Sequence, residues 1–391
     1  MSRLRIALVA HGVHFRGGME RNFAELASAF CREHDVHLFT AEAGDVPFDA
    51  ITLHRVPVVS KPIAAKFLQF YARSSQMLRK EQFDIVHTIG GITARQDVVT
   101  AQYCQYAWGN AIAREPGAGE GITAYHQMMW RLTGYFEKLA MNSRHTQFVS
   151  ANSQRTRTDL ETFYGTDPAK IHVIYNGVDP VRFTPENRKG RAEIRSRYGV
   201  REDARLLLFV GEYRRKGLAN IIRALGQIQQ PNVHLLAVGR GDLDHFAGLA
   251  EAAGAREQVT LAGPASDIER VFGAADAFVF PTLYEPFGMV ITEAMASGLP
   301  VITSRQAGAA EMIEDGASGL LLDAPGDVQE LASVMERLLL SGINSDAMGA
   351  KARDSVIGYD WAKVAAETMG LYRQVAQNRA GLSLATHEAT L

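Results

Sequence analysis

The sequence predicts an α/β protein with two doubly wound domains, each built on a parallel sheet. Apolar segments of strand length alternate with helical segments along almost the whole chain, which is typical of a parallel sheet covered on both faces. Glycine-rich turns lead directly from a strand into a helix, as at Gly17 and Gly18. The 391 residues are too many for one ordinary core, so two domains are expected.

The first half of the chain supplies one set of alternating elements. A first strand at residues 5–10 ends in a loop with Gly12, Gly17 and Gly18, and a helix is expected at 20–31. Further strands are expected at 36–40, 51–56, 85–87, 98–101, 148–151 and 171–175. Helices are expected at 125–141 and from the N-cap Ser153 to Tyr164, before the turn at 176–179.

The second half repeats the pattern after a polar, basic stretch at 180–199 that we interpret as a linker. Strands at 206–210, 233–238, 259–261, 277–281 and 299–303 alternate with helices that begin at Leu218, His245 and Ser266. We place the first domain at 1–182 and the second at 183–360. The amphipathic helix 361–377 is a candidate to pack back onto the first domain, and 378–391 is expected to be a frayed, disordered tail.

Composition excludes several classes of protein. The formal net charge of −2 argues against nucleic-acid binding, which needs a basic excess. Cys31 and Cys104 make no disulfide framework and fit a reducing compartment. The apolar part of the first ten residues is too short for a signal peptide, and no window has the length of a membrane span. We expect a cytoplasmic protein.

The most informative segment runs from Tyr284 to Gly298 and connects a buried strand to a helix. In parallel sheets ligands bind at the carboxyl ends of the strands. Gly288 leaves the backbone amides of 287–289 open, and amides at a helix start form an anion site. Glu285 lies before these amides and Glu293 on the first turns after them, so the segment suits a sugar nucleotide.

Two further loops of the second half end strands. Residues 211–217 place Arg214, Arg215 and Lys216 beside a helix start, which suits a diphosphate, although a lone basic run is also typical of a solvated turn. The second loop begins at Gly239 and carries Asp242 and Asp244. Aspartates in a glycine turn are usually helix caps, so no metal site is predicted.

The first half offers weaker candidates. Gly17 and Gly18 could bring the backbone close to the phosphates or the acceptor, or simply shape a tight turn. His87 and Gln102 end strands and are acceptor-side candidates, with a packed interior role as the alternative. The basic amphipathic stretch 61–80 suits an anionic membrane surface and equally an ordinary surface helix.

These residues together resemble retaining glycosyltransferases of family 4, over nearly the whole chain. The family's Glu-x7-Glu motif matches Glu285 to Glu293, and its Arg-Lys-Gly matches 215–217. Ile-Tyr-Asn-Gly-Val-Asp at 174–179 with Phe183, and the segments 298–303 and 314–321, fit as well. The sequence Phe-Arg-Gly-Gly-Met-Glu-Arg-Asn-Phe at 15–23 is most similar to lipopolysaccharide core glucosyltransferases. The resemblance implies the GT-B architecture, with two Rossmann-like domains facing a cleft.

The resemblance also implies roles for these residues. Arg215 and Lys216 would contact the diphosphate, Glu285 the hydroxyls of the transferred sugar and Glu293 the ribose. The implied donor-binding set is Gly17, Gly18, Gly211, Arg215, Lys216, Gly239, Glu285, Phe287, Gly288, Met289 and Glu293. Preorganised cations and amides would stabilise the leaving phosphate without a metal or other cofactor, and no protein nucleophile is needed.

Two positions depart from the family pattern. Glu212 stands where many relatives have arginine, and Gln102 stands where relatives often have histidine. The second departure makes His87 the stronger acceptor-side candidate.

The expected activity is transfer of a hexose-type sugar from a nucleotide-diphosphate sugar, most of all a UDP-sugar, to a glycan or glycolipid such as lipopolysaccharide core. Peripheral contact to the inner membrane is a further expectation. The alternatives are a nucleotide-sugar epimerase and a non-catalytic sugar-nucleotide-binding subunit.

Overall fold

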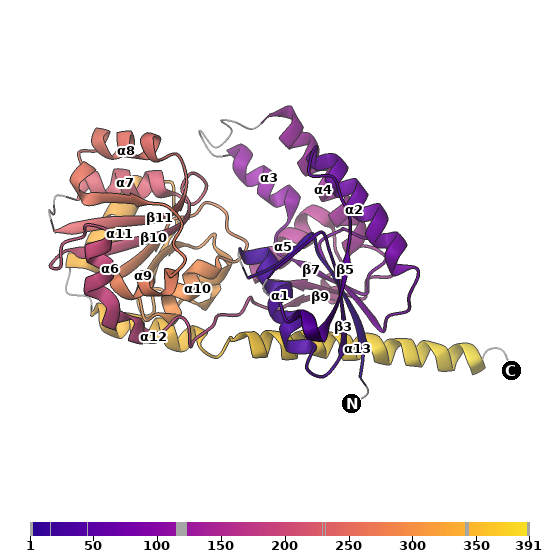
Figure 1. Cartoon of the computed structure of the whole chain (residues 1–391). Helices are drawn as coiled ribbons and strands as arrows, with labels where there is room; N and C mark the ends of the chain where they lie inside the picture. Colours follow the sequence, from indigo (N-terminus) through magenta and orange to yellow (C-terminus); the bar gives the residue numbers. More distant parts are fainter. Residues whose placement is uncertain are drawn as a thin grey trace. The chain divides into compact units, whose positions relative to one another are not determined.

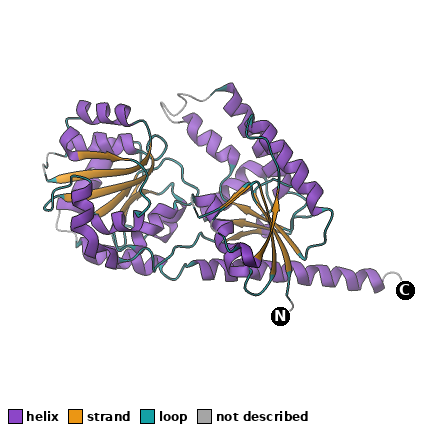
Figure 2. Ribbon diagram, in the orientation of Figure 1, coloured by secondary structure: helices purple, strands orange, loops and turns teal. Residues whose placement is uncertain are grey.

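The chain folds into two compact units in a computed structural model that describes residues 3–15, 17–44, 46–114, 123–228, 230, 232–340 and 344–388 (Figure 1). One unit comprises Met1–Asn176 with Trp361–Leu391, and the other Gly177–Asp360. Each is a parallel sheet with helices on both faces (Figure 2), which confirms the predicted fold class. The division after Asn176 differs from the predicted one after residue 182.

The first unit is built on a seven-stranded sheet in the order β5-β3-β1-β6-β7-β8-β9. Every pairing in it is parallel. Its strands are β1 (Arg5–Val9), β3 (Asp35–Thr40), β5 (Ile51–Arg55), β6 (Ile85–Ile89), β7 (Val98–Ala101), β8 (Phe148–Ala151) and β9 (Ile171–Val173). The strand order reverses direction between β1 and β6, and ligands bind at such a switch point.

Helices cover this sheet because each one has an apolar stripe. In α1, for example, Phe23, Leu26 and Phe30 recur at helical spacing and are buried. The helices are α1 (Gly18–Phe30), α2 (Ile63–Leu78), α3 (Gln105–Arg114), α4 (Ala124–Met141), α5 (Gln154–Asp159) and α13 (Trp361–Glu388). Ser153 caps the start of α5 by accepting a hydrogen bond from the Thr156 amide at 2.9 Å, and a π-helical turn, Leu160–Tyr164, continues the helix at its end.

The smaller elements of this unit are a parallel strand pair and two 3₁₀ turns. They are β2 (Gly12–Val13), β4 (Glu42–Ala43), η1 (Phe48–Ala50) and η3 (Pro168–Lys170).

The C-terminal helix α13 belongs to the first unit although it follows the second in the chain. The Tyr372 hydroxyl lies 2.6 Å from Nδ1 of His87, in the middle of the sheet, and Arg379 forms an ion pair with buried Asp97 at 2.5 Å. Residues 378–388, which the sequence suggests are a frayed tail, are helical in the structure. Residues 389–391 lie outside the described part of the chain.

The second unit repeats the architecture with a six-stranded parallel sheet in the order β12-β11-β10-β13-β14-β15. Its strands are β10 (Arg205–Glu212), β11 (Val233–Arg240), β12 (Val259–Ala262), β13 (Ala277–Phe280), β14 (Val301–Ser304) and β15 (Leu320–Leu322). Its helices are α6 (Arg191–Arg197), α7 (Leu218–Gln227), α8 (Leu243–Ala252), α9 (Ile268–Ala274), α10 (Met289–Ala296), α11 (Val328–Leu340) and α12 (Ser345–Val356). Here the switch point lies between β10 and β13.

Residues 180–199 are part of the second unit's folded structure, which corrects their interpretation as a linker. They form the 3₁₀ turn η4 (Pro185–Gly190) and α6, which contact α9. Arg195 is buried and pairs with Asp276 at 2.8 Å, and Arg191 pairs with the same carboxylate at 2.7 Å. The basic character of this stretch therefore serves ion pairs within the unit. Two other 3₁₀ turns are η5 (Arg256–Gln258) and η6 (Gly308–Met312).

Within the described ranges, no helix is both long enough and apolar enough to cross a membrane.

Candidate functional site

The switch point of the second unit brings together the two loops that the sequence singled out. The loop after β10 carries Lys216 and the loop after β13 carries Glu285, and their side chains form an ion pair. About a fifth of the Lys216 side chain and 15% of the Glu285 side chain are exposed. The pair therefore lies largely inside the unit but within reach of a ligand.

Glycine lets these two loops approach each other. Gly217 has a φ of +86°, and a Cβ atom there would lie 2.4 Å from the carbonyl oxygen of Pro281. No side chain fits at that distance, and a positive φ is unfavourable for residues with a Cβ. Gly217 thus fixes the position of Lys216 relative to the segment after β13.

The loop after β14 holds the Glu285 segment from its other side. The amide of Gly308 donates to the carbonyl oxygen of Glu285 at 2.9 Å, and the amide of Ala309 donates to that of Phe287 at 2.7 Å. The phenyl ring of Phe287 is buried. Three strand-end loops thereby position one carboxylate, which is the preorganisation that a binding site requires.

Gly288 turns the chain from this segment into α10. Its φ is +94°, and a Cβ atom on it would lie 3.0 Å from Cγ of Glu285 and 2.9 Å from Cδ1 of Ile291. The helix begins at Met289, so the amides of its first turn point away from the helix toward its N-terminal end. Glu293 lies on the second turn and is half-buried. The structure thus keeps the predicted order of carboxylate, helix start and second carboxylate.

Glu212 stabilises the basic loop that follows it. Its carboxylate accepts hydrogen bonds from the amides of Arg214 and Arg215 at 3.2 and 3.0 Å, and it forms an ion pair with the Arg215 side chain at 2.9 Å. More than half of the Arg215 side chain is exposed. The residue that departs from the family pattern therefore holds the loop in shape and leaves Arg215 at the surface.

The glycine and the first aspartate of the loop after β11 have structural roles. A Cβ atom on Gly239 would lie 1.8 Å from the carbonyl oxygen of Gly211 on the neighbouring strand, so only glycine fits. Asp242 caps α8 by accepting a hydrogen bond from the amide of His245 at 3.1 Å. The expectation that this aspartate is a helix cap is confirmed.

The first unit has a pocket at its own switch point, with a volume of about 310 Å³. The residues after β1, β6 and β7 form its inner part, and α1, α2 and α4 enclose it. Its lining residues are Ala10, His11, Gly12, Met19, Glu20, Ile63, Lys66, Phe67, Ile89, Gly90, Gly91, Ile92, Ala101, Gln102, Tyr103, Met129, Thr133 and Glu137. Apolar walls with a few polar groups are typical of small-ligand sites.

Glu137 of α4 is the most buried acid in this pocket, with 7% of its surface exposed. Its Oε2 accepts hydrogen bonds from the Tyr164 hydroxyl at 2.6 Å and from the Gln105 amide at 3.1 Å. Burial raises the pKa of Glu137 to about 7, because no cation compensates the loss of hydration, although both hydrogen bonds act in the opposite direction.

His11 contributes an uncharged imidazole to the same pocket. Its ring lies 4.1 Å from the ring of Phe70, centroid to centroid, and Nδ1 is buried without a hydrogen-bond partner among the described residues. Burial, with a smaller effect of Lys66, lowers the pKa of His11 to about 4. Neutral imidazole is therefore the form present at physiological pH.

Gln102 and His87, the two acceptor-side candidates, have different environments. Gln102 lines the pocket and belongs to a network of buried amides with Asn152 and Asn176. His87 is completely buried: Nδ1 contacts the Tyr372 hydroxyl and Nε2 lies 2.7 Å from Oγ1 of Thr100. Burial lowers the pKa of His87 to about 3. His87 is therefore corrected from an acceptor-side candidate to a packed interior residue.

Comparison with known proteins agrees with this architecture. The family model for Glycosyltransferase Family 4 matches residues 16–182, and the one for Glycosyl transferases group 1 matches residues 190–355. The lipopolysaccharide glucosyltransferase WaaG of Escherichia coli (strain K12) is 28% identical over 330 residues, 83% of this chain and 86% of WaaG. The crystal structure of WaaG, a glycosyltransferase involved in lipopolysaccharide biosynthesis, matches with a TM-score of 0.78 and 27% identity over 93% of this chain and 98% of WaaG. The chain is a glycosyltransferase of the GT-B type.

Two other proteins resemble this glycosyltransferase over most of their length. An uncharacterized glycosyltransferase of Methanocaldococcus jannaschii, MJ1607, is 26% identical over 374 residues, 91% of this chain and 94% of that protein. The crystal structure of HepE from Anabaena in complex with UDP-glucose matches with a TM-score of 0.70 over 97% of this chain and all of that one. At 20% identity this second match shows the fold alone.

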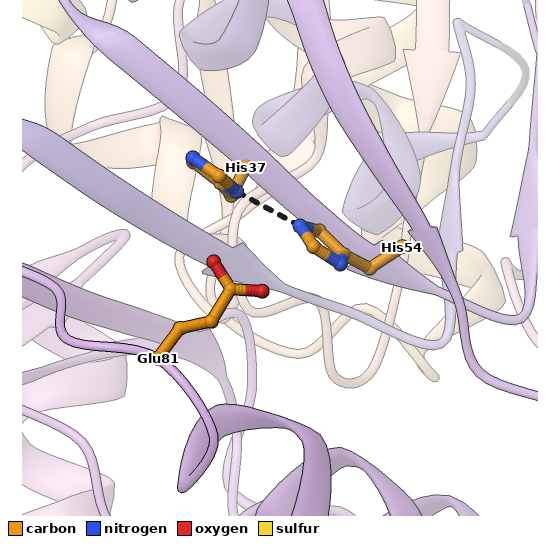
Figure 3. Close-up of side chains that lie close together, drawn as sticks. All are labelled: His37, His54 and Glu81. Atoms are coloured by element: carbon orange, nitrogen blue, oxygen red, sulfur yellow. Dashed lines mark hydrogen bonds between the residues drawn. The ribbon is translucent and has the colours of Figure 1, made fainter.

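Outside both switch points, the glycosyltransferase has one group of side chains with metal-ligand chemistry in its described residues. His37, His54 and Glu81 point toward one another, with Nδ1 of His37 2.8 Å from Nε2 of His54 (Figure 3). Arg5, however, forms an ion pair with Glu81 and donates from Nε to Nε2 of His37 at 3.2 Å. The guanidinium already supplies the cation of this cluster, so the cluster ties β1, β3 and β5 to the loop after α2.

Sequence reasoning missed Glu137 in this glycosyltransferase. In the sequence it is one charged residue in an amphipathic helix, and such residues usually face water. Nothing local distinguishes it, because the partners that bury it, Gln105 and Tyr164, belong to other elements. The structure shows the approach directly: a Cβ atom on Gly91 would lie 2.2 Å from the carbonyl oxygen of Phe136, so the loop after β6 touches α4.

Proposed function

We propose that the glycosyltransferase is a retaining, metal-independent enzyme that transfers a hexose-type sugar from a UDP-sugar to a hydroxyl of a glycan or glycolipid. The observation that carries this proposal is the ion pair between Lys216 and Glu285 at the switch point of the second unit, beside the start of α10. A cation, a carboxylate and helix amides at one strand edge match the phosphates and hydroxyls of a sugar nucleotide.

In the proposed reaction each partner of the ion pair meets a different part of the donor. Lys216, the exposed Arg215 and the amides at the start of α10 stabilise the diphosphate, and Glu285 accepts hydrogen bonds from sugar hydroxyls. The bond from the anomeric carbon to the phosphate oxygen breaks, and its electron pair stays on the phosphate. The acceptor oxygen bonds to the anomeric carbon on the same face, and its proton passes to the leaving phosphate.

Relatives support the choice of donor and acceptor. HepE was crystallised with UDP-glucose, and WaaG is a lipopolysaccharide glucosyltransferase. We assign Glu293 to the ribose, because it follows the helix start by one turn, and the backbone at Gly211, Gly239, Gly288 and Met289 to the rest of the donor. Gly17 and Gly18, at the exposed start of α1, are proposed to contribute from the first unit.

A donor-binding panel tests this proposal. Binding to the native state raises the melting temperature, so UDP-glucose should stabilise the protein more than GDP- or ADP-glucose does. Glu285→Ala should keep the fold and abolish sugar release from the donor, whereas Glu269→Ala, in a surface ion pair of the same unit, should retain turnover. Unchanged turnover in Glu285→Ala would contradict the assignment.

Product analysis separates the alternatives. Transfer yields a glycoside of the acceptor and retains the anomeric configuration, whereas an epimerase yields a different sugar from donor alone. A binding subunit would leave the donor intact. We expect the activity to survive EDTA treatment, because Arg215 and Lys216 take the role that a divalent cation has in other transferases. If EDTA removed the activity and a metal ion restored it, metal independence would be contradicted.

We further propose that the surface formed by α2 and α4 contacts an anionic membrane. Large apolar side chains are exposed there, including Ile63 on α2 and Met128 and Tyr135 on α4, and α2 also carries Lys66 and Arg73. The Ala64 amide donates to the Tyr125 hydroxyl at 3.1 Å, so the two helices are neighbours. Sedimentation with anionic vesicles should fall in the double variant Ile63→Ser, Met128→Ser; equal sedimentation would contradict the contact.

A further inference from the structure

The pocket of the first unit has a polar end that is built for one type of contact. Glu137 uses Oε2 for both of its hydrogen bonds within the protein, so Oε1 is the atom left for a ligand. Oε1 lies on the side of Gly90, 3.8 Å from the place of a Cβ atom on that residue. Both glycine and carboxyl line the pocket. Oε1, which can accept a hydrogen bond, therefore faces the cavity from a side chain that is more than nine-tenths buried.

The remaining walls of the pocket are mostly apolar. Phe67, Ile92 and Met129 are buried around it, and Met19 and Ile63 are exposed at its rim. A volume of about 310 Å³ lies at the lower end of the range of roughly 300–1,000 Å³ that is typical of small-ligand pockets. The size therefore suits a single ring, and the apolar walls suit its C–H face.

The charged groups of the pocket give it no excess of positive charge. Lys66 and Glu20 are opposite in sign, and neither has an ion-pair partner in the part of the chain that the structure describes. His11 is neutral because burial lowers its pKa, and Glu137 is partly protonated near pH 7 because burial raises its pKa. An anionic ligand would therefore find no excess of positive charge here.

We infer that this pocket binds the acceptor through one pyranose ring that carries no anionic group, with Glu137 as the residue that determines specificity by accepting a hydrogen bond from a ring hydroxyl. The inference rests on the proposed glycosyl transfer and adds the chemical class of the acceptor unit and the residue that selects it. An anionic ring would find no excess of positive charge in the pocket, and a flat apolar ligand would leave Oε1 without a hydrogen-bond partner.

Saturation-transfer NMR with methyl glycosides tests the inference. The probes are the neutral methyl pyranosides of glucose, galactose and mannose, with the corresponding anionic methyl uronides, at pH 8 where Glu137 is ionised. At least one neutral glycoside should bind, and it should bind more tightly than the corresponding uronide. Binding of no neutral glycoside, or stronger binding of a uronide, would overturn the inference.

Two variants then locate the site. In Glu137→Gln the carbonyl oxygen must face the Tyr164 and Gln105 donors, so an amide NH₂ replaces the charged acceptor, and affinity should fall at least fivefold, since charge-assisted hydrogen bonds are about twice as strong as neutral ones. Thr133→Phe should abolish binding by filling the pocket. Glu161→Gln, in a surface ion pair of the same unit, is the matched control and should bind like the wild type. Wild-type affinity in both pocket variants would overturn the assignment.

Failure of the inference can be separated from failure of the proposed function. UDP-glucose binding is measured on the same samples, and it should be unchanged in Glu137→Gln and Thr133→Phe. Donor binding without pyranoside binding contradicts the pocket assignment alone. Pyranoside binding in a protein that binds no nucleotide sugar contradicts the proposed transfer and leaves the pocket in place.

Discussion

Two glutamates show how the environment of one residue type decides its chemistry. Glu285 meets the ammonium group of Lys216, whereas Glu137 meets a hydroxyl and an amide and no cation. Burial without a compensating cation raises the pKa of Glu137 to about 7, so this carboxyl changes protonation near neutral pH. Glu285 instead forms an ion pair within reach of a ligand, which suits a binding site for a polar group.

Glu137 should make stability fall as the pH rises. The pKa of this carboxyl is about 7 in the folded protein and 4.5 in the ordinary case, so the folded state binds more protons between these values. The wild type should therefore lose up to about 3 kcal/mol of unfolding free energy relative to Glu137→Gln between pH 4.5 and pH 8. Urea unfolding at several pH values measures it.

The buried histidines change stability with pH in the opposite direction, but they are present in both the wild type and the Glu137→Gln variant. Their lowered pKa values remove stability as the pH falls below about 6.5, in wild type and variant alike. The difference between the two curves therefore isolates Glu137. Parallel curves would mean that its pKa is not raised.

Gly217 should tolerate no side chain. Alanine there would adopt an unfavourable positive φ and place its Cβ atom 2.4 Å from the Pro281 carbonyl oxygen, so Gly217→Ala should cost at least about 1–3 kcal/mol and weaken donor binding. Gly248→Ala is the control: it lies within α8 with open space around it and should stabilise by about 0.5–1 kcal/mol. Thermal unfolding measures the stability of both variants. If Gly217→Ala were as stable as the wild type, the close approach of Gly217 to the Pro281 carbonyl would be contradicted.

At the scale of elements, the C-terminal helix α13 completes the first unit, although it follows the second unit in the chain. It brings Tyr372 to His87 at the centre of the sheet and Arg379 to Asp97, which in turn accepts a hydrogen bond from the Val86 amide at 2.8 Å. Burial raises the pKa of Asp97 while Arg379 lowers it, so the ion pair partly offsets the cost of burying the carboxyl. One helix thus satisfies two buried polar groups of the sheet.

Removing the Tyr372 hydroxyl should therefore destabilise the first unit. Tyr372→Phe leaves Nδ1 of buried His87 without its partner, which should cost about 1–3 kcal/mol in urea unfolding. Tyr135→Phe, on an exposed side chain of the same unit, should change stability by less than about 0.5 kcal/mol. A neutral effect of Tyr372→Phe would show that the buried contact adds no net stability.

At the scale of the whole molecule, one topology is used twice. Both sheets run outward in chain order from a central strand, β1 or β10, and reverse there, and each unit places its candidate site at that reversal. The reason is geometric, since the loops after two adjacent parallel strands diverge to opposite faces and leave a crevice between them. The units differ in continuity: the second is one stretch of chain, the first is two.

That difference predicts unequal behaviour of fragments. Residues 177–360 contain every strand and helix of their unit and should unfold cooperatively as an isolated fragment, with UDP-glucose raising the melting temperature. Residues 1–176 lack α13 and should be destabilised until a peptide spanning 361–388 is added. Circular dichroism with thermal scans measures both fragments. A stable 1–176 fragment would contradict the role assigned to α13.

Much of the fold could be predicted because its signals are local. The strands of both sheets up to β14, and the helix start at Met289, follow from apolar runs, glycine turns and caps that lie within a few residues of each other. The short strand β15 and the helices α3, α11 and α12 were missed. The basic stretch 180–199 was misinterpreted because its ion-pair partner, Asp276, is distant in sequence.

The sequence by itself determined the alternation of elements, the family, and the placing of Glu285 and Lys216 on strand-end loops, because parallel topology brings such loops to one edge. Only the tertiary structure decided that His87 is an interior residue and that Glu137 faces a pocket. Burial and protonation of these side chains depend on Tyr372 for the histidine and on Gln105 and Tyr164 for the glutamate, partners that only folding brings into contact.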